Sequence, residues 1–244
     1  MAVSWVEARR VDAWVQGRAL RDRLLAEYCE RYRLATPPPP ANVIDELLTE
    51  HLNVRLTFDP LPLDRFAETA MRGGEICVTI NSDTASIAGV KDVEGVQNVA
   101  KWHEAIHVVD HSSVLRDPSS QLLLDGFAPK PPIICYRSGA AQTKRTSQEE
   151  VAREFWAEEA GRAAAVSLPA LRRTQPFIEL LERASRSDGP VRSAFPLLYQ
   201  ASEAIGVNIS ALIKQLQGER LIAIERNGSD NLVFVQSHLL ENAP

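Results

Sequence analysis

The sequence predicts a mainly helical α+β protein, in which a small sheet packs on two long helices and a winged-helix-like element follows at the C-terminal end. Three observations lead to this fold class. Two long segments, 93–111 and 147–166, have the composition and periodicity of helices. Two short segments, 54–58 and 76–80, alternate apolar and polar residues as half-buried strands do. The segment 195–244 has the order helix, turn, helix and hairpin that is typical of a winged helix.

The composition is that of an ordinary globular protein. Of the 244 residues, 45% are hydrophobic and 24% are charged, and the formal net charge is -5. This composition excludes a mainly disordered chain, and no run approaches the roughly 18 apolar residues that a membrane span needs. The charged, amphipathic segment 1–15 does not resemble a signal peptide. The cysteines Cys29, Cys77 and Cys135 are widely spaced and form no metal motif, so we expect a reduced, cytoplasmic protein without a membrane partner.

The chain divides into three expected regions. Residues 1–36 are predicted to form one or two amphipathic helices, and Pro37–Pro40 make a stiff linker after them. The central domain spans residues 41–192. The winged-helix-like module spans residues 195–244 and contains a hairpin turn at Asn227-Gly228. The apolar positions that recur at helical spacing in the first region are Val11, Trp14, Val15, Leu20, Leu24, Leu25 and Tyr28.

A short helix and two strands are expected at the start of the central domain. Asn42 is a candidate N-cap for a helix that ends near His51. Turn residues close the two strands, Asp59-Pro60 after the first and Asn81-Ser82 after the second. The positions expected to face inward are Val43, Leu47 and Leu48 in the helix, Val54, Leu56 and Phe58 in the first strand, and Ile76, Val78 and Ile80 in the second.

The predicted helix 93–111 contains the motif His-Glu-x-x-His at residues 103–107. Positions i and i+4 lie one turn apart on one face of a helix, so the imidazoles of His103 and His107 can bind one metal ion. Glu104 lies next to the first ligand, where it can accept a proton from a water molecule at that ion. Nitrogen ligands favour zinc among the available ions. The motif therefore predicts a zinc site with Glu104 as general base.

A catalytic zinc site needs a third protein ligand, and the spacing leaves several candidates. Glu150, Glu154 and Glu158 recur at i, i+4 and i+8 on one face of the second long helix. His111 lies two turns beyond His103, about 12 Å along the helix axis, which is too far to close a tetrahedron easily. We therefore expect His111 at the helix end or behind a ligand, and the spacing alone does not choose among the three glutamates.

The sequence resembles the ImmA/IrrE family of zinc-dependent metallo-endopeptidases over roughly residues 40–225. The features that match in chain order are the segment Leu56–Pro62, the strand end Ile80-Asn81, the motif at 103–107 with His111 after it, Cys135-Tyr136-Arg137, Glu154-Phe155-Trp156-Ala157-Glu158, Leu168-Pro169, Ile205-Gly206-Val207, Leu216 and Leu221-Ile222. The resemblance implies a metallopeptidase domain over 41–192. It favours Glu154 as third ligand, because Glu154 and Ala157 match the E-x-x-A element of the family, and it leaves Glu158 as the alternative.

The resemblance also implies a mechanism and a class of substrate. The family cleaves proteins, often a transcriptional repressor that controls a mobile element or a stress response. Tyr136 and Arg137 are candidates to stabilise the oxyanion, and the strand 76–80 is expected to present an edge to an extended peptide. The rival hypothesis is a regulatory protein that binds DNA or another partner and keeps the peptidase fold without turnover.

The charge of the C-terminal module does not favour DNA binding. Its three cations are Lys214, Arg220 and Arg226, and its five anions are Glu203, Glu219, Glu225, Asp230 and Glu241. A surplus of negative charge repels the phosphate backbone of a duplex. We therefore expect the module to pack on the protein or to bind a protein partner.

Overall fold

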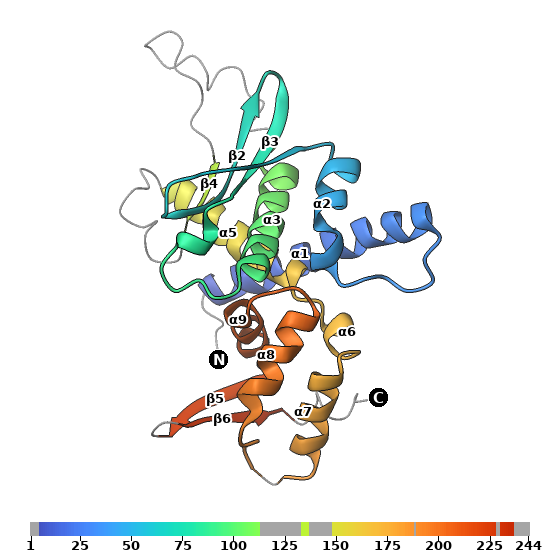
Figure 1. The fold of residues 1–244 in the computed structure, drawn as a ribbon, viewed down its shortest axis with the longest axis vertical. Helices are drawn as coiled ribbons and strands as arrows, with labels where there is room; N and C mark the ends of the chain where they lie inside the picture. The colour runs from blue at the N-terminus through green and yellow to red at the C-terminus, as the bar shows by residue number, and fades with distance from the viewer. Residues whose placement is uncertain (1–4, 113–132, 137–147, 188, 228–229, 237–244) are drawn as a thin grey trace.

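The computed structural model describes residues 5–112, 133–136, 148–187, 189–227 and 230–236. The chain is mainly helical and contains a small mixed sheet, as predicted. In Figure 1 the sheet and the two long helices α3 and α5 form the upper part, and the helices α6 to α9 with a hairpin form the lower part. Within the described ranges, none of the helices combines the length and the apolar character needed to cross a membrane.

The N-terminal region is one continuous helix, α1 (Trp5–Tyr32), which packs against α5. Its contact face consists partly of small residues, since Ala13 is buried and Gly17 touches the backbone of Ala160. The expected apolar stripe is wrong at two positions, because Val11 and Val15 are 45% and 51% exposed. The contact between α1 and α5 is narrow because the helices pack closely, and these two valines lie outside it. Leu20 and Leu24 are buried as predicted.

A buried glutamate adds polar contacts to the α1–α5 seam. Glu159 accepts a hydrogen bond from the indole nitrogen of Trp14 at 2.9 Å, and the guanidinium of Arg10 lies 3.4 Å away. Arg162, one turn along α5, also pairs with Glu159. Buried charges are tolerated when they are paired in this way. Residues 10 and 14 of α1 therefore hold the same helix that carries Glu154.

The chain next forms a helical stretch of three kinds of turn, a 3₁₀ turn (Pro40–Val43), a short α-helix α2 (Ile44–Glu46) and a π turn (Leu47–His51). Asn42 is not the N-cap, because helical winding already begins at Pro40, whose fixed φ suits a first helical position. The predicted inward positions Val43, Leu47 and Leu48 are buried.

The sheet has four strands in the order β1-β3-β2-β4. β1 (Arg55–Asp59) is parallel to β3 (Glu75–Asn81), and β2 (Arg65–Arg72) is antiparallel both to β3 and to β4 (Ile133–Tyr136). β1 and β3 were expected from their alternation, and β2 was not. A 3₁₀ turn over Thr84–Ser86 follows the sheet.

The expectation that residues 76–80 present a free edge is wrong. β3 lies inside the sheet, with β1 on one side and the unpredicted β2 on the other, and it is buried on both faces from Ile76 to Asn81. The outer strands are β1 and β4. Phe58, expected inward on β1, is 49% exposed and lies near the ammonium of Lys101, 5.3 Å from its ring centroid.

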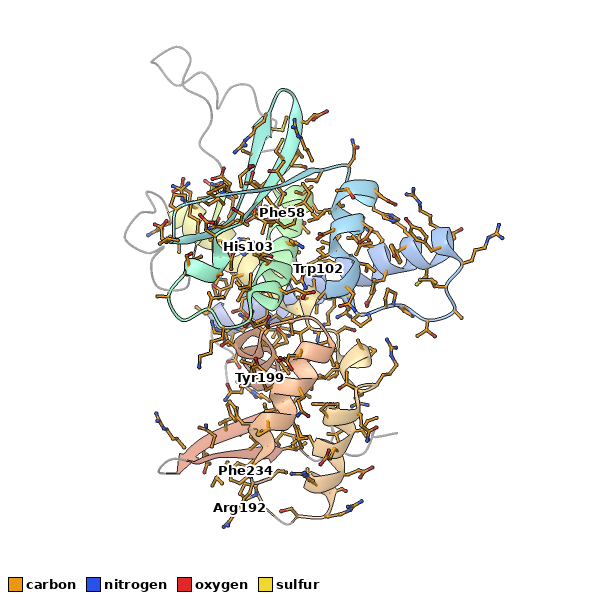
Figure 2. All side chains as sticks on the ribbon, in the orientation of Figure 1. Phe58, Trp102, His103, Arg192, Tyr199 and Phe234 are labelled. Atoms are coloured by element: carbon orange, nitrogen blue, oxygen red, sulfur yellow. The ribbon has the colours of Figure 1, made fainter. Side chains whose placement is uncertain are left out.

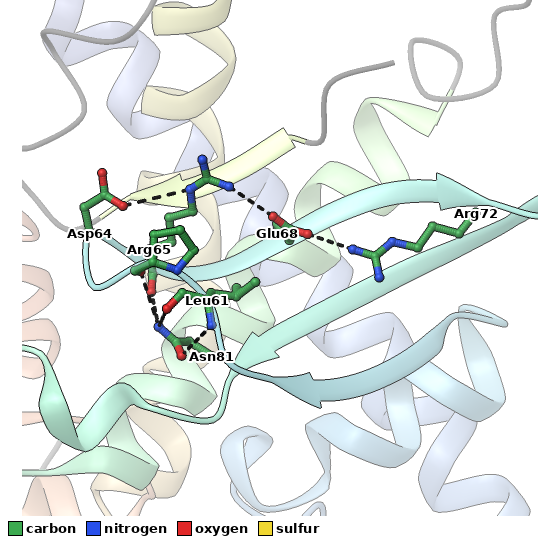
Figure 3. Close-up of polar contacts among 7 residues, drawn as sticks. Leu61, Asp64, Arg65, Glu68, Arg72 and Asn81 are labelled. Atoms are coloured by element: carbon green, nitrogen blue, oxygen red, sulfur yellow. Dashed lines mark hydrogen bonds and ion pairs between the residues drawn. The ribbon is translucent and has the colours of Figure 1, made fainter. Parts of the chain in front are cut away.

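The turn that leads into β2 is held by a buried asparagine at the end of β3 (Figure 3). The side-chain oxygen of Asn81 accepts from the amide of Leu61 at 3.1 Å, and its nitrogen donates to the carbonyl of Arg65 at 2.8 Å. Farther along β2, Arg65 and Arg72 flank the buried carboxylate of Glu68 at 3.3 and 2.8 Å. The Asn81 contacts thus hold the start of the strand that carries Thr69 beside the end of β3.

The two long helices match the prediction closely: α3 spans Val93–Asp110 and α5 spans Gln148–Ala165. Every residue of α3 from 100 to 108 is buried, because the sheet and α5 cover this helix from different sides. Gly161 allows α5 to approach α3 closely, since a Cβ at this position would lie 2.7 Å from the Cα of His103.

The C-terminal part contains α6 (Leu168–Leu171), α7 (Gln175–Ser185), α8 (Ala194–Ala204) and α9 (Ile209–Gly218), followed by a hairpin of β5 (Ile222–Asn227) and β6 (Asp230–Val235). α8, α9 and the hairpin lie where they were expected. α7 was not predicted, although its apolar side is buried at Phe177, Leu180, Leu181 and Ala184. β6 also bridges back to Val191, before α8.

The close approach of α3 and α5 gives a first prediction. In an exposed helix interior, Gly→Ala stabilises a protein by about 1 kcal/mol. Gly161→Ala should instead lower the free energy of unfolding by about 1–3 kcal/mol, because the new methyl group overlaps the backbone of His103. Urea denaturation measures this change in the free energy of unfolding. Gly189→Ala is the control, since a Cβ there meets nothing within 4 Å. A Gly161→Ala protein as stable as the wild type would contradict the close packing.

Candidate metal centre

Three buried side chains meet between α3 and α5, His103 and His107 from α3 and Glu154 from α5. The Nε2 atoms of the two histidines are 2.9 Å apart. The Glu154 oxygens lie 3.4 Å from each Nε2, Oε2 beside His103 and Oε1 beside His107. All three residues are at most 8% exposed. Figure 2 shows His103 within the upper part of the molecule, where α3 lies beneath the sheet.

The spacing of these donor atoms suits a metal ion. Bonds of about 2.0–2.1 Å in a tetrahedron place the donor atoms roughly 3.3–3.4 Å apart. The two separations between Glu154 and the imidazoles, 3.4 Å each, match this value, and the Nε2 atoms of the two histidines, 2.9 Å apart, lie somewhat closer together. Two imidazoles and one carboxylate also form a donor set that leaves the fourth position of a tetrahedron open. The group could therefore hold a metal ion with one open coordination position.

The structure separates the candidate third ligands that the spacing left open. Glu154 lies in the group with the two histidines, whereas Glu150 and Glu158 do not. The side chain of Glu158 is 50% exposed and lies 3.7 Å from the guanidinium of Arg162 and 3.8 Å from the ammonium of Lys214. One helical turn therefore separates a buried ligand position from a partly exposed position.

His111 lies behind His107, on the side away from Glu154. Its Nδ1 is 2.9 Å from the Nδ1 of His107, while the Nε2 of His107 faces His103. A hydrogen bond to the far nitrogen of a metal-binding imidazole fixes its tautomer and ring orientation. This position matches the expectation that His111 supports a ligand and does not itself complete the site.

Glu104 is fully buried, and its two oxygens differ in their surroundings. Oε2 accepts a hydrogen bond from the hydroxyl of Thr69 on β2. Oε1 is buried and has no hydrogen-bond partner within the described part of the chain. Thr69 was not predicted from the sequence, because the polar residues of β2 kept this segment from being recognised as a strand. The result is a carboxylate that is held at one oxygen and free at the other.

The protonation states of His107 and Glu154 suit metal binding, whereas the pKa of His103 is raised, because its hydrogen bond with Glu154 outweighs the effect of burial. Burial raises the pKa of Glu104 to about 7 and lowers the pKa of His107 to about 4. Burial opposes ionisation of Glu154, but hydrogen bonds from His103 and His107 outweigh it and hold the pKa of this carboxyl well below its ordinary value. A neutral imidazole and an ionised carboxylate are the forms that bind a cation.

Two expected contributors lie largely outside the described residues. The backbone of Tyr136 ends β4, next to β2, and Arg137 lies beyond the described range. Their role at the oxyanion therefore stays a prediction. No protein-family model, no curated protein and no solved structure matches the chain. The chemistry of the centre is accordingly inferred from its own geometry.

The choice between the two glutamates gives a second prediction. Glu154→Gln should weaken zinc affinity at least about 100-fold, because it removes a charged ligand, and Glu158→Gln should leave the affinity within a few-fold of wild type. Competition titration with a fluorescent chelator measures both constants. Both substitutions exchange glutamate for glutamine on the same helix. A larger effect at Glu158 would therefore place the third ligand one turn beyond Glu154.

The buried Glu104 gives a third prediction, on the metal-free protein. A pKa of about 7 in the folded chain, against an ordinary 4.5, means that the folded state holds this proton more tightly. The stability that it contributes is complete below about pH 4.5 and is lost as the pH rises through 7. Glu104→Gln has no proton to lose.

The variant should therefore gain about 2–3 kcal/mol of unfolding free energy relative to wild type between pH 5 and pH 8. Denaturant titrations of both chelated proteins across this range measure the difference. A difference that stays constant with pH would show that Glu104 ionises normally.

Proposed function

We propose that the protein is a zinc-dependent metallo-endopeptidase, as its resemblance to the ImmA/IrrE family implies. The observation that carries the proposal is the free, buried Oε1 of Glu104 beside the group His103, His107 and Glu154. Glu104 is close enough for the charges of His103 and Glu154 to act on its pKa. A purely structural metal site has no use for a second carboxylate that is buried but not placed among the ligands.

The donor set supports zinc and an open, catalytic kind of site. Imidazole and carboxylate ligands suit zinc, and structural zinc sites are normally closed by four protein ligands. Here the described residues supply three. Zinc bound at this position would polarise a water molecule and the carbonyl group of a peptide bond.

Glu104 is the proposed general base. Its Oε1 would accept a proton from the attacking water and later deliver it to the leaving amine, while Thr69 keeps Oε2 in place. A pKa raised to about 7 allows both transfers near neutral pH. His103, His107 and Glu154 would hold the ion, and His111 would orient His107.

A cavity beside the centre supports a substrate of more than a few atoms. Its volume is about 600 Å³, and both His103 and Glu154 line it. Ligand-binding cavities commonly measure about 300–1,000 Å³. By resemblance, the substrate is a protein, and a transcriptional repressor or another regulator is the proposed kind.

The C-terminal part is proposed to be winged-helix-like, and this is supported by the order α8, α9, β5, β6. DNA binding is not favoured. Its five anions outnumber its three cations, and one of those cations, Arg220, lies 2.6 Å from the carboxylate of Glu7. The rival hypothesis of a regulatory protein without turnover therefore finds less support than the enzyme.

A fourth prediction separates catalysis from metal binding. Glu104→Gln should retain one zinc ion per chain and lose hydrolysis at least about 100-fold, the usual contribution of a general base. His103→Ala should lose both. Zinc is measured by elemental analysis, and hydrolysis by mass spectrometry of new N-termini in a digest of whole-cell protein. The proposal fails if zinc-loaded wild type generates no new termini, or if the Gln variant generates as many.

A further inference from the structure

The cavity at the metal centre extends to the C-terminal helices. Its lining includes His103 and Glu154 of the metal-binding group, and also Tyr199 of α8 and Ile209 and Lys214 of α9. Figure 2 shows Tyr199 on α8, at the end of the lower part that faces His103. The cavity therefore lies between the helices that carry the candidate metal ligands, α3 and α5, and the C-terminal part.

Much of the cavity lining is apolar. Val96, Val99 and Ala100 come from α3, Phe66 comes from β2, and Val90 comes from the segment before α3. Ile209, in the first turn of α9, adds an apolar side chain from the other part. This apolar part of the lining suits an apolar side chain of a bound peptide.

The C-terminal wall is fixed to α3 by close backbone contacts. The side-chain amide of Asn98 donates to the carbonyl of Gly206 at 3.0 Å, and the side-chain amide of Asn208 donates to the carbonyl of Gly95 at 3.4 Å. A Cβ on Gly95 would lie 2.5 Å from the backbone nitrogen of Asn208. The first turn of α9 is therefore held beside the start of α3 as part of one cavity.

The anions that line the cavity are already engaged. Glu154 belongs to the metal centre, and Asp92 accepts from the backbone amide of Gly95 at 2.8 Å as the N-cap of α3. Glu158 is shared by Arg162 and Lys214 at 3.7 and 3.8 Å.

Two of the residues that line the cavity are lysines that reach solvent. Lys91 is exposed, and the side chain of Lys214 is 52% exposed. An ion pair as long and as exposed as that between Lys214 and Glu158 contributes little. The ammonium groups of Lys91 and Lys214 are thus available to a ligand, while Arg162 is held by Glu159.

We infer that the C-terminal helices form one wall of the substrate cleft, and that Lys91 and Lys214 select a peptide segment that carries an acidic side chain near an apolar one. The inference rests on the proposed function for the identity of the site. It gives the C-terminal part a role in substrate recognition that does not involve DNA.

The test uses the full-length Glu104→Gln protein and an array of immobilised octapeptides. Each peptide has one fixed Leu, and the other positions are varied in turn among Asp, Asn and Lys. We expect peptides with Asp at one position to bind more tightly than the same peptides with Lys. Adding Lys214→Glu should shift this Asp-to-Lys preference about tenfold toward Lys, since an attraction becomes a repulsion. Lys91→Glu should shift it in the same direction.

Arg186→Glu is the matched control, because Arg186 is 76% exposed and lies outside the cavity. This reversal should leave the preference unchanged. The inference is overturned if no peptide binds, or if Lys214→Glu and Lys91→Glu both leave the preference as it is in the Glu104→Gln protein. Selective binding without cleavage by zinc-loaded wild type would support the cleft and refute the peptidase. Cleavage by the wild type, with a preference that neither Lys214→Glu nor Lys91→Glu changes, would support the peptidase and refute the role of the two lysines in the cleft.

Discussion

The packing of α5 against α3 places the metal-binding groups together. His103 and His107 share one face of α3 through local helix geometry, but Glu154 reaches them only because the helix axes come close. Ala157, Ala160 and Ala164 of α5 are buried, and Gly161 touches the backbone of His103. Small residues in α5 therefore serve close packing against both α1 and α3, in addition to their helix propensity.

This packing places four ionisable groups in a region with little solvent. Burying an isolated charge is costly, and proteins offset the cost by pairing, by metal binding or by a changed protonation state. Pairing and changed protonation both occur here: Glu154 pairs with two imidazoles, and burial lowers the pKa of His107 and raises the pKa of Glu104. A cation between His103, His107 and Glu154 would compensate the negative charge of the group.

Local signals predicted the elements that depend on local physics. The bounds of α3 and α5 follow from periodicity and composition, and the pairing of His103 with His107 follows from one helical turn. The third ligand does not follow from local signals, since Glu154 and Glu158 lie on the same helix and differ only in the neighbours that they face. β2 was missed because its buried positions include Glu68 and Thr69, which look exposed until Arg65, Arg72 and Glu104 are placed beside them. Thr69 could not be found without that strand.

The coordination of zinc in the loaded protein tests the central claim most directly. X-ray absorption at the zinc edge reports the type and distance of the atoms bound to the ion. The structure predicts nitrogen and oxygen neighbours only, at about 2.0–2.2 Å, with scattering from two imidazole rings. Sulfur neighbours at about 2.3 Å, or a shell of oxygens without imidazole, would show that the ion binds elsewhere and would contradict the centre formed by His103, His107 and Glu154.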